Sequence, residues 1–390
     1  MKSRFPQARE EKRRALLGAV EEVRDVLAAG TGEAEKLRTL PPASVAALRD
    51  SFLLTLKLPA ELGGAEADLV TQFDVIEAVS YIEASAGWCL FIGAAAGGMA
   101  GAFLPDGAVA QIFSGERMPT FVGSLMRGSA VAVEGGYRLS GRWSYGSGIH
   151  HAEWIAVPAV IARNGGGPFE IRSCVFPAKQ AVIHDNWHVM GLRGTGSCDY
   201  SVADLFVPED FTYDRTWTSR RGGPLYRLAF PGFVTLETAA FAIGLGRRAL
   251  DEIVALARAK SRGYGKQMSL AGRAVFQRAV AEGDLRLRAA RTLNIDMLER
   301  TWTLLCEGQP VEPRLQAELR AGGALAIDAA LEVATSAFRY GAGTAIRADH
   351  VLQRCLRDLH VAGTHLIVSD SSYENYGQFL LGVSGADPMA

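Results

Sequence analysis

The feature that most constrains the fold of this chain is a change in the spacing of its apolar residues. Between residues 121 and 207 they recur at every second position in short runs, which is typical of strands that bury one face. On both sides of this region they recur at every third or fourth position, which is typical of amphipathic helices. The pattern predicts an α+β protein in which a β region of about a hundred residues separates two helical regions.

The same spacing predicts the individual elements. We expect strands near residues 121–126, 130–144, 154–162, 170–183 and 198–207. We expect helices over residues 9–29, 42–52, 67–84, 231–261, 271–306, 313–340 and 351–370. The last four have the lengths of an antiparallel four-helix bundle. The predicted domains are an N-terminal helical domain (1–118), a central β domain (119–215) and a C-terminal helical bundle (216–390).

One uncharged segment, Gly87 to Leu104, is long enough to cross a membrane and has glycines at GxxxG spacing. Most of its residues are Gly and Ala, which supply little transfer free energy, so we expect a tightly packed core helix and no membrane role.

The N-terminus is densely charged and lacks the apolar run of a secretory signal. We therefore expect a cytoplasmic protein.

Composition excludes several kinds of partner. The 41 Lys and Arg residues nearly balance the 42 Asp and Glu residues, so charge gives no reason to expect nucleic acid. The five cysteines are far apart and form no CxxC pair, which indicates neither a disulfide framework nor a metal site.

The GxGxxA pattern at residues 244–249 lies within a helical pattern with no preceding strand, so we interpret it as small residues at a helix contact. No other segment resembles a nicotinamide site, and a redox reaction would need electrons from elsewhere.

The block GGYRLSGRWSYGSGIHHAEW, residues 135–154, contains the first candidate site residue. After the alternating residues 137–143, Ser147 lies between Gly146 and Gly148. Neither neighbour has a Cβ, so backbone and hydroxyl can approach a flat ligand closely. The alternative is an ordinary polar turn residue.

The order of helical domain, β domain and helical bundle resembles the acyl-CoA dehydrogenase-like fold. The segment WHVMGLRGTGSCDYSVADLFVP, residues 187–208, resembles the second β-domain signature of that superfamily. Three further segments resemble its oxygenase branch, the reduced-flavin-dependent two-component monooxygenases, which include phenolic hydroxylases and dibenzothiophene monooxygenases. These segments are FVGSLMRGSA, GRWSYGSGIHHAEW and LQRCLRDLHVAGTH. The resemblance covers residues 40–382.

This resemblance implies a flavin-dependent monooxygenase, the oxygenase component of a two-component system. Its cofactors would be reduced flavin (FMNH2 or FADH2) and O2, with the flavin supplied by a separate NAD(P)H-dependent flavin reductase. The flavin would bind between the β domain and the bundle and form a C4a-hydroperoxide, which oxygenates an aromatic or heteroaromatic small molecule. Such an intermediate needs a dry pocket with nearby hydrogen-bond donors. The family also implies a homotetramer.

The resemblance assigns roles to five residues. Ser147 matches the serine that faces the flavin N5 and the peroxide, and Ser124 belongs to the preceding flavin-contacting strand. Trp187 and Ser197 match positions that line the ring and its side chain. Arg262 matches an arginine that reaches the flavin phosphate of a neighbouring subunit, for which a guanidinium is well suited. The alternatives are core burial for Trp187 and a solvated helix end for Arg262.

His365 is the candidate for proton transfer, because an imidazole titrates near neutrality and its segment resembles the catalytic C-terminal segment of the branch. We expect it on the helix over 351–370, with His360 on a different part of the helix surface. The alternative is a structural histidine. His150 and His151 would point to opposite faces of a strand, which argues against a metal site.

Two departures from the family limit the assignment. Residues 363–366 replace the glutamate base of many dehydrogenases, which argues against desaturation of an acyl thioester. The segment 88–104 lacks a histidine found in several phenolic hydroxylases, so an electron-rich polycyclic, indole, nitrogen or sulfur substrate fits at least as well as a phenol. The alternatives are an acyl-CoA dehydrogenase-like flavoenzyme with its base elsewhere, an N- or S-oxygenating relative, and a non-catalytic flavin-binding protein.

Overall fold

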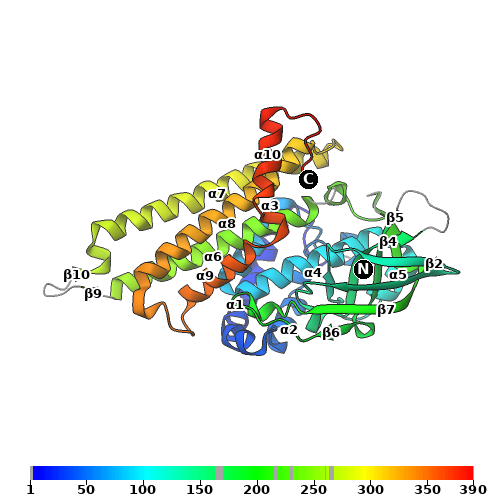
Figure 1. The fold of residues 1–390 in the computed structure, drawn as a ribbon, viewed down its shortest axis with the longest axis horizontal. Helices are drawn as coiled ribbons and strands as arrows, with labels where there is room; N and C mark the ends of the chain where they lie inside the picture. Colours follow the sequence, from blue (N-terminus) through cyan, green and yellow to red (C-terminus); the bar gives the residue numbers. More distant parts are fainter. Residues whose placement is uncertain are drawn as a thin grey trace. The chain divides into compact units, whose positions relative to one another are not determined.

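The computed structural model describes residues 3–162, 170–214, 218–228, 232–259, 261–262 and 268–389 (Figure 1). The chain forms two compact units. The first comprises Met1–Gln72, Trp88–Val189 and Arg193–Ala229, and the second comprises Phe73–Gly87, Met190–Leu192 and Phe230–Ala390. The first unit thus holds the sheet and most of the N-terminal helical region, of which residues 73–87 belong to the second unit. The boundaries at residues 118 and 215 remain a proposal about the order of domains along the chain.

The N-terminal part of the chain is helical, as its periodicity predicts. Its helices are α1 (Arg9–Leu37), α2 (Pro42–Asp50), α3 (Leu69–Ile82), α4 (Ala84–Phe103) and α5 (Asp106–Phe113). Helix α1 buries Leu16, Val20, Val23 and Leu27, whose spacing of three and four residues forms one apolar stripe. Helix α2 begins with a proline, whose missing N–H has no intrahelical partner at that position.

Helix α4 is the uncharged Gly/Ala segment. By length and composition both α4 and the stretch Pro313–Thr344 could span a membrane, and the most apolar windows of these helices are 89% and 56% buried inside the protein. Gly98 allows α4 to approach the backbone of Lys57 closely, since a Cβ at this position would lie 2.8 Å from the Lys57 carbonyl oxygen. The burial of α4 is that of a core helix.

The β region forms one eight-stranded sheet in the first unit. Its strands are β1 (Phe121–Gly123), β2 (Gly128–Val133), β3 (Gly136–Trp143), β4 (Trp154–Ala162), β5 (Glu170–Pro177), β6 (Val182–His184), β7 (Asp199–Pro208) and β8 (Thr212–Asp214). The order is β6-β7-β3-β2-β4-β5-β8, and β1 pairs with β4. Strand β4 pairs in parallel with β1 and β2 and antiparallel with β5. Its consecutive residues 155–159 are all buried, so both of its faces are covered, as its two-sided apolar sequence predicts.

Two expected strands are each divided in the structure. The run expected over 130–144 is the hairpin of β2 and β3, which turns at Gly135 with a φ of 76°. The run expected over 170–183 is β5 and β6, separated by a short helical turn at Ala178–Gln180. In the first case the alternation continues through the turn, so periodicity alone does not reveal it.

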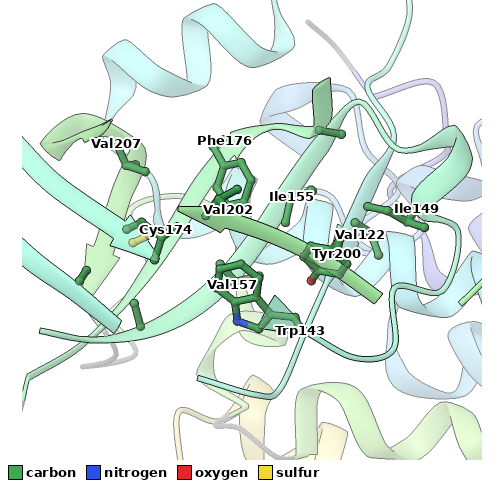
Figure 2. Close-up of a cluster of buried hydrophobic side chains, with 14 of the residues drawn as sticks. Val122, Trp143, Ile149, Ile155, Val157, Cys174, Phe176, Tyr200, Val202 and Val207 are labelled. Atoms are coloured by element: carbon green, nitrogen blue, oxygen red, sulfur yellow. The ribbon is translucent and has the colours of Figure 1, made fainter. Parts of the chain in front are cut away.

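The core of the sheet unit is formed by inward-facing side chains of several strands (Figure 2). The rings of Trp143 from β3 and Tyr200 from β7 stack with centroids 5.6 Å apart and an interplanar angle of 23°. Val122, Ile155 and Val157 are fully buried nearby. This core fixes the strand ends from which the candidate site projects.

The second unit is dominated by helices. They are α6 (Gly232–Ala259), α7 (Ala274–Cys306), α8 (Pro313–Gly341), α9 (Val351–Ala362) and α10 (Ser371–Leu381), and α6 to α9 lie side by side in Figure 1. The GxGxxA pattern lies inside α6. A Cβ on Gly246 would be 2.7 Å from Leu287 and 3.0 Å from Ala330, so the interpretation as small residues at a helix contact is confirmed.

The expectation of one helix over 351–370 is wrong. Helix α9 ends at Ala362, a short 3-10 turn follows at Leu366–Val368, and α10 begins at Ser371. Gly363 is the residue that caps the end of α9. Glycine has a low helix propensity, so an end here is physically reasonable. His365 is therefore not on a helix surface.

Candidate functional site

The centre of the candidate site is a crossing of two chain segments in the first unit. Backbone hydrogen bonds join them: the N–H of Gly146 donates to Cys198 O at 3.0 Å, and the N–H of Gly148 donates to Thr195 O at 2.8 Å. Gly148 and Gly196 have φ values of 87° and 56°, in the left-handed region that favours glycine. The glycines flanking Ser147 therefore serve the backbone of this crossing.

The crossing brings three hydroxyl groups together. Ser147 Oγ and Ser197 Oγ are 2.8 Å apart, and Ser197 Oγ is 2.6 Å from Thr195 Oγ1. The indole Nε1 of Trp88 donates to Ser147 Oγ at 3.1 Å. All four side chains are at most 5% exposed. We call Ser147, Ser197 and Thr195 the hydroxyl cluster.

The hydroxyl cluster can give or take a hydrogen bond without becoming charged. Each hydroxyl has one proton and two lone pairs. The two bonds between the three oxygens use two of the three protons, so one proton remains for an acceptor outside the cluster. The cluster joins Ser147 and Ser197, two of the residues expected at a flavin.

Two sequence-predicted residues lie in connecting segments of the same unit, Ser124 directly after β1 and Trp187 between β6 and β7. Ser124 follows β1, and its Oγ accepts a hydrogen bond from the N–H of Met126 at 3.1 Å. Trp187 is 8% exposed, and its ring meets that of Tyr145 edge to face at 5.9 Å. Its carbonyl oxygen accepts from the guanidinium of Arg38 at 3.4 Å. Both residues retain groups suited to ligand contact, and their roles stay predictions.

The two adjacent histidines differ from the expectation. They lie in a 3-10 turn, Ile149–His151, and not on a strand, so the argument from opposite strand faces is wrong. His151 Nδ1 is buried and makes no hydrogen bond among the described residues. Burial above all, and then the charges of His150 and Arg49, lower the pKa of His151 to about 4. The ring next to Gly148 is therefore neutral in ordinary buffers.

His365 lies in the second unit, at the start of the 3-10 turn Leu366–Val368. Its Nδ1 accepts a hydrogen bond from the N–H of Ile367 at 3.3 Å, so the neutral ring carries its proton on Nε2. Burial lowers the pKa of His365, which keeps the ring neutral at pH 7. His350 makes a similar cap at the start of α9, where its Nδ1 accepts from the N–H of Leu352 at 3.2 Å.

A second titratable group of this unit is buried at the start of α4. Burial raises the pKa of Glu83 to about 7, against the lowering effect of a hydrogen bond from the N–H of Ala86. The carboxylate of Asp358 also raises it, and Asp358 accepts from the N–H of Leu192 at 2.6 Å. Glu83 therefore changes charge close to neutrality.

The last predicted residue is Arg262. Its backbone belongs to the two-residue strand Ser261–Arg262, which pairs with Met268–Ser269. Its side chain lies outside the described residues, so its role at a flavin phosphate stays a prediction.

Sequence reasoning missed Trp88 and Thr195. Trp88 is 59 positions from Ser147, and no local pattern links the two. One signal was available, because Trp88 places a large ring with a polar N–H in a segment composed mostly of Gly and Ala.

Comparisons with known proteins identify the family of the chain. Residues 236–370 match the family model described as "Acyl-CoA dehydrogenase, C-terminal domain". The chain is 31% identical to the indole-3-acetate monooxygenase of Pseudomonas putida, covering 90% of each chain. It is 27% identical to the flavin-dependent monooxygenase oxygenase subunit HsaA of Mycobacterium tuberculosis, covering 91% of this chain and 92% of that one.

The chain belongs to the two-component flavin-dependent monooxygenases, as an oxygenase component. A solved structure supports the fold: XiaF from Streptomyces sp. in complex with FADH2 and glycerol superimposes with a TM-score of 0.90 at 25% identity, covering 97% of each chain. The predicted fold, the enzyme class, aromatic hydroxylation and the use of reduced flavin with O2 are thus confirmed.

Proposed function

We propose that this monooxygenase hydroxylates an indole-like bicyclic heteroaromatic compound. The observation that carries the proposal is the likeness at 31% identity to a protein named for indole-3-acetate. The sequence adds a second argument, because α4 holds none of the seven histidines, whereas several phenolic hydroxylases carry one there. An indole ring is already electron-rich and does not need activation by removal of a phenolic proton.

The hydroxyl cluster has the chemistry that a flavin ring requires. Its groups are neutral, buried and able to donate or accept hydrogen bonds. We infer that Ser147, Ser197 and Ser124 hold the polar edge of the flavin and that Trp187 packs beside it. Reduced flavin, when bound, supplies the two electrons with which one oxygen atom of O2 goes to the substrate and the other to water.

The remaining roles follow from the state of each side chain. Ser147 presents a hydroxyl in a setting from which water is largely excluded, where a hydrogen bond is stronger than in water. Because the ring of His365 is neutral, it can take up a proton but cannot deliver one, so we assign it the removal of a proton from a substrate atom, for which the ring must adopt the tautomer with a free Nε2. Arg262 is assigned to a flavin phosphate of a neighbouring subunit, which requires an oligomer, and we propose a homotetramer.

The test is turnover with an added NAD(P)H-dependent flavin reductase, which we propose as the natural partner in the cytoplasm. We expect NADH-dependent formation of a hydroxylated indole, with one oxygen atom from 18O2 and a higher kcat/KM for indoles than for phenols. FMN and FAD are compared in parallel. Exclusive S- or N-oxygenation in a panel of thioethers and amines would overturn the substrate assignment, as would a preference for simple phenols.

A further inference from the structure

Trp88 is linked directly to the residue assigned to the flavin, although it lies 59 positions away in the chain. Its indole N–H donates to Ser147 Oγ at 3.1 Å, and its ring meets that of Phe91 edge to face with centroids 4.9 Å apart. We propose that Trp88 is a positioning residue that determines how Ser147 discriminates between oxidised and reduced flavin. This inference rests on the proposed function, in which Ser147 holds the polar edge of the flavin, and on the resemblance that places this serine at N5.

The bond from Trp88 limits the states of Ser147. A serine hydroxyl has one proton and two lone pairs, and the indole, which can only donate, permanently occupies one lone pair. One proton and one lone pair remain, and the bond to Ser197 uses one of them. If Ser197 donates to Ser147, only the proton of Ser147 is left for a ligand. If Ser147 donates to Ser197, only a lone pair is left.

The rest of the hydroxyl cluster allows both states. Ser197 can accept from Thr195 while it donates to Ser147, or accept from Ser147 while it donates to Thr195, because both O–O distances suit either direction. Reversing the chain of bonds moves no charge. Ser147 is therefore either a donor or a single acceptor toward a ligand, and the orientation of Ser197 and Thr195 follows.

The two redox states of flavin need different states of this hydroxyl. N5 of oxidised flavin is a hydrogen-bond acceptor, and N5 of reduced flavin carries a hydrogen. Donation from Trp88 polarises the Ser147 hydroxyl, which makes it a better donor and a poorer acceptor. Loss of the indole N–H should therefore weaken the binding of oxidised flavin more than that of reduced flavin.

The experiment measures equilibrium binding rather than turnover. Trp88→Phe keeps an aromatic ring beside Phe91 and removes the N–H donor together with part of the ring volume, a loss of volume that Trp143→Phe reproduces. We expect the Kd for oxidised flavin to rise about 5- to 10-fold, the range for one hydrogen bond, while the Kd for reduced flavin under anaerobic conditions changes by less than about 2-fold. The reduction potential of the bound flavin should rise accordingly.

Two controls separate this role from a general effect on folding. Trp143 is a buried tryptophan of the same unit whose Nε1 makes no hydrogen bond among the described residues, so Trp143→Phe should leave the ratio of the two Kd values unchanged. In a Ser147→Ala background, Trp88→Phe should no longer change the ratio.

The outcomes distinguish the inference from its premise. Equal rises of both Kd values in Trp88→Phe, or the same change of ratio in Trp143→Phe, would overturn the role of Trp88. A change of ratio that persists without the Ser147 hydroxyl would overturn the path through Ser147. If the parent protein binds neither oxidised nor reduced flavin, the proposed flavin site itself is wrong.

Discussion

The hydroxyl cluster of the first unit and His365 of the second handle protons in different ways. Ser147, Ser197 and Thr195 exchange hydrogen bonds while staying neutral, so their state depends on the ligand and not on pH. His365 has a ring whose charge is set by pH and whose Nδ1 is engaged in a backbone cap. The difference teaches that a redox-sensing contact can be built from groups that stay neutral, while removal of a proton from a substrate needs a group that titrates.

The sharpest test of the second half of this comparison is His365→Asn. Asparagine can still cap the turn at Ile367, because its side-chain oxygen is a good N-cap acceptor, but it has no titrating ring. We expect product formation to fall by a factor on the order of 10² to 10⁴, the range for a lost general acid or base. In the parent, product formation should decrease as the pH is lowered below about 6.5, because burial places the pKa of His365 below that value.

The matched control for this variant is His350→Asn. His350 makes the same kind of cap at α9, so its replacement should leave product formation unchanged. Glu83→Gln serves as a second control. With its pKa near 7, Glu83 would place an inflection of product formation at a higher pH than His365 does, and Glu83→Gln would lack that inflection. Full activity in a stable His365→Asn protein would reduce His365 to a structural cap.

The second test asks whether the surroundings of the hydroxyl cluster stay uncharged. The pKa of His151 is lowered to about 4, so the folded protein binds this proton less readily than the unfolded chain. The neutral His151 ring contributes about 3 kcal/mol to the free energy of unfolding above about pH 6.5, and this contribution is lost as the pH falls toward 4. Urea unfolding of the parent and of His151→Gln at both pH values measures it.

The reference for this comparison is pH 7.5, where the imidazole is neutral in the folded and the unfolded chain. The difference between the two proteins at that pH gives the effect of packing alone. If the parent and the variant lose the same free energy of unfolding between pH 6.5 and pH 4, His151 titrates normally and the first unit contains an ordinary charged histidine beside Gly148.

The third test removes the Ser147 hydroxyl. In Ser147→Ala the ligand loses one hydrogen bond in a buried setting, so we expect oxygen transfer to fall about 30-fold, equivalent to about 2 kcal/mol. The NADH oxidised without product should appear as H2O2. Ser129→Ala is the control, because Ser129 is exposed and its hydroxyl only donates to the carbonyl of Ser140. Unchanged coupling in Ser147→Ala would leave Ser147 as a turn residue.

The fold could be predicted from the sequence because burial imposes a period on each element. The strip of apolar residues in α1 and the two-sided apolar run of β4 are both local patterns with a direct physical cause. The ends of helices and strands were harder to predict. The turn at Gly135 and the end of α9 near Gly363 depend on single residues, and neighbouring apolar residues continue the period across them.

The candidate site could be predicted only in part. Ser147 stands out because glycines flank it, and Ser197 follows from resemblance. Trp88 does not stand out, because its hydrogen bond to Ser147 joins positions 59 apart in the chain. The hydroxyl of Thr195 is bonded to Ser197 only two positions away, but the backbone contact that brings Thr195 to Gly148 joins distant segments. The environment of the His365 side chain could not be predicted either, because the local sequence does not distinguish a histidine that caps a turn from one on the surface of a helix.

The crossing at Gly148 and Thr195 has a consequence for the order of folding. The hydroxyl cluster joins residue 147 to residues 195 and 197, and strands β4, β5 and β6 lie within the loop that these contacts close. Contacts of such large sequence separation form slowly, because the loop-closure entropy must first be overcome by the sheet. The pairing of β3 with β7 closes the same loop, so the cluster requires that pairing, and a partly unfolded chain that lacks it has no redox-sensing contact.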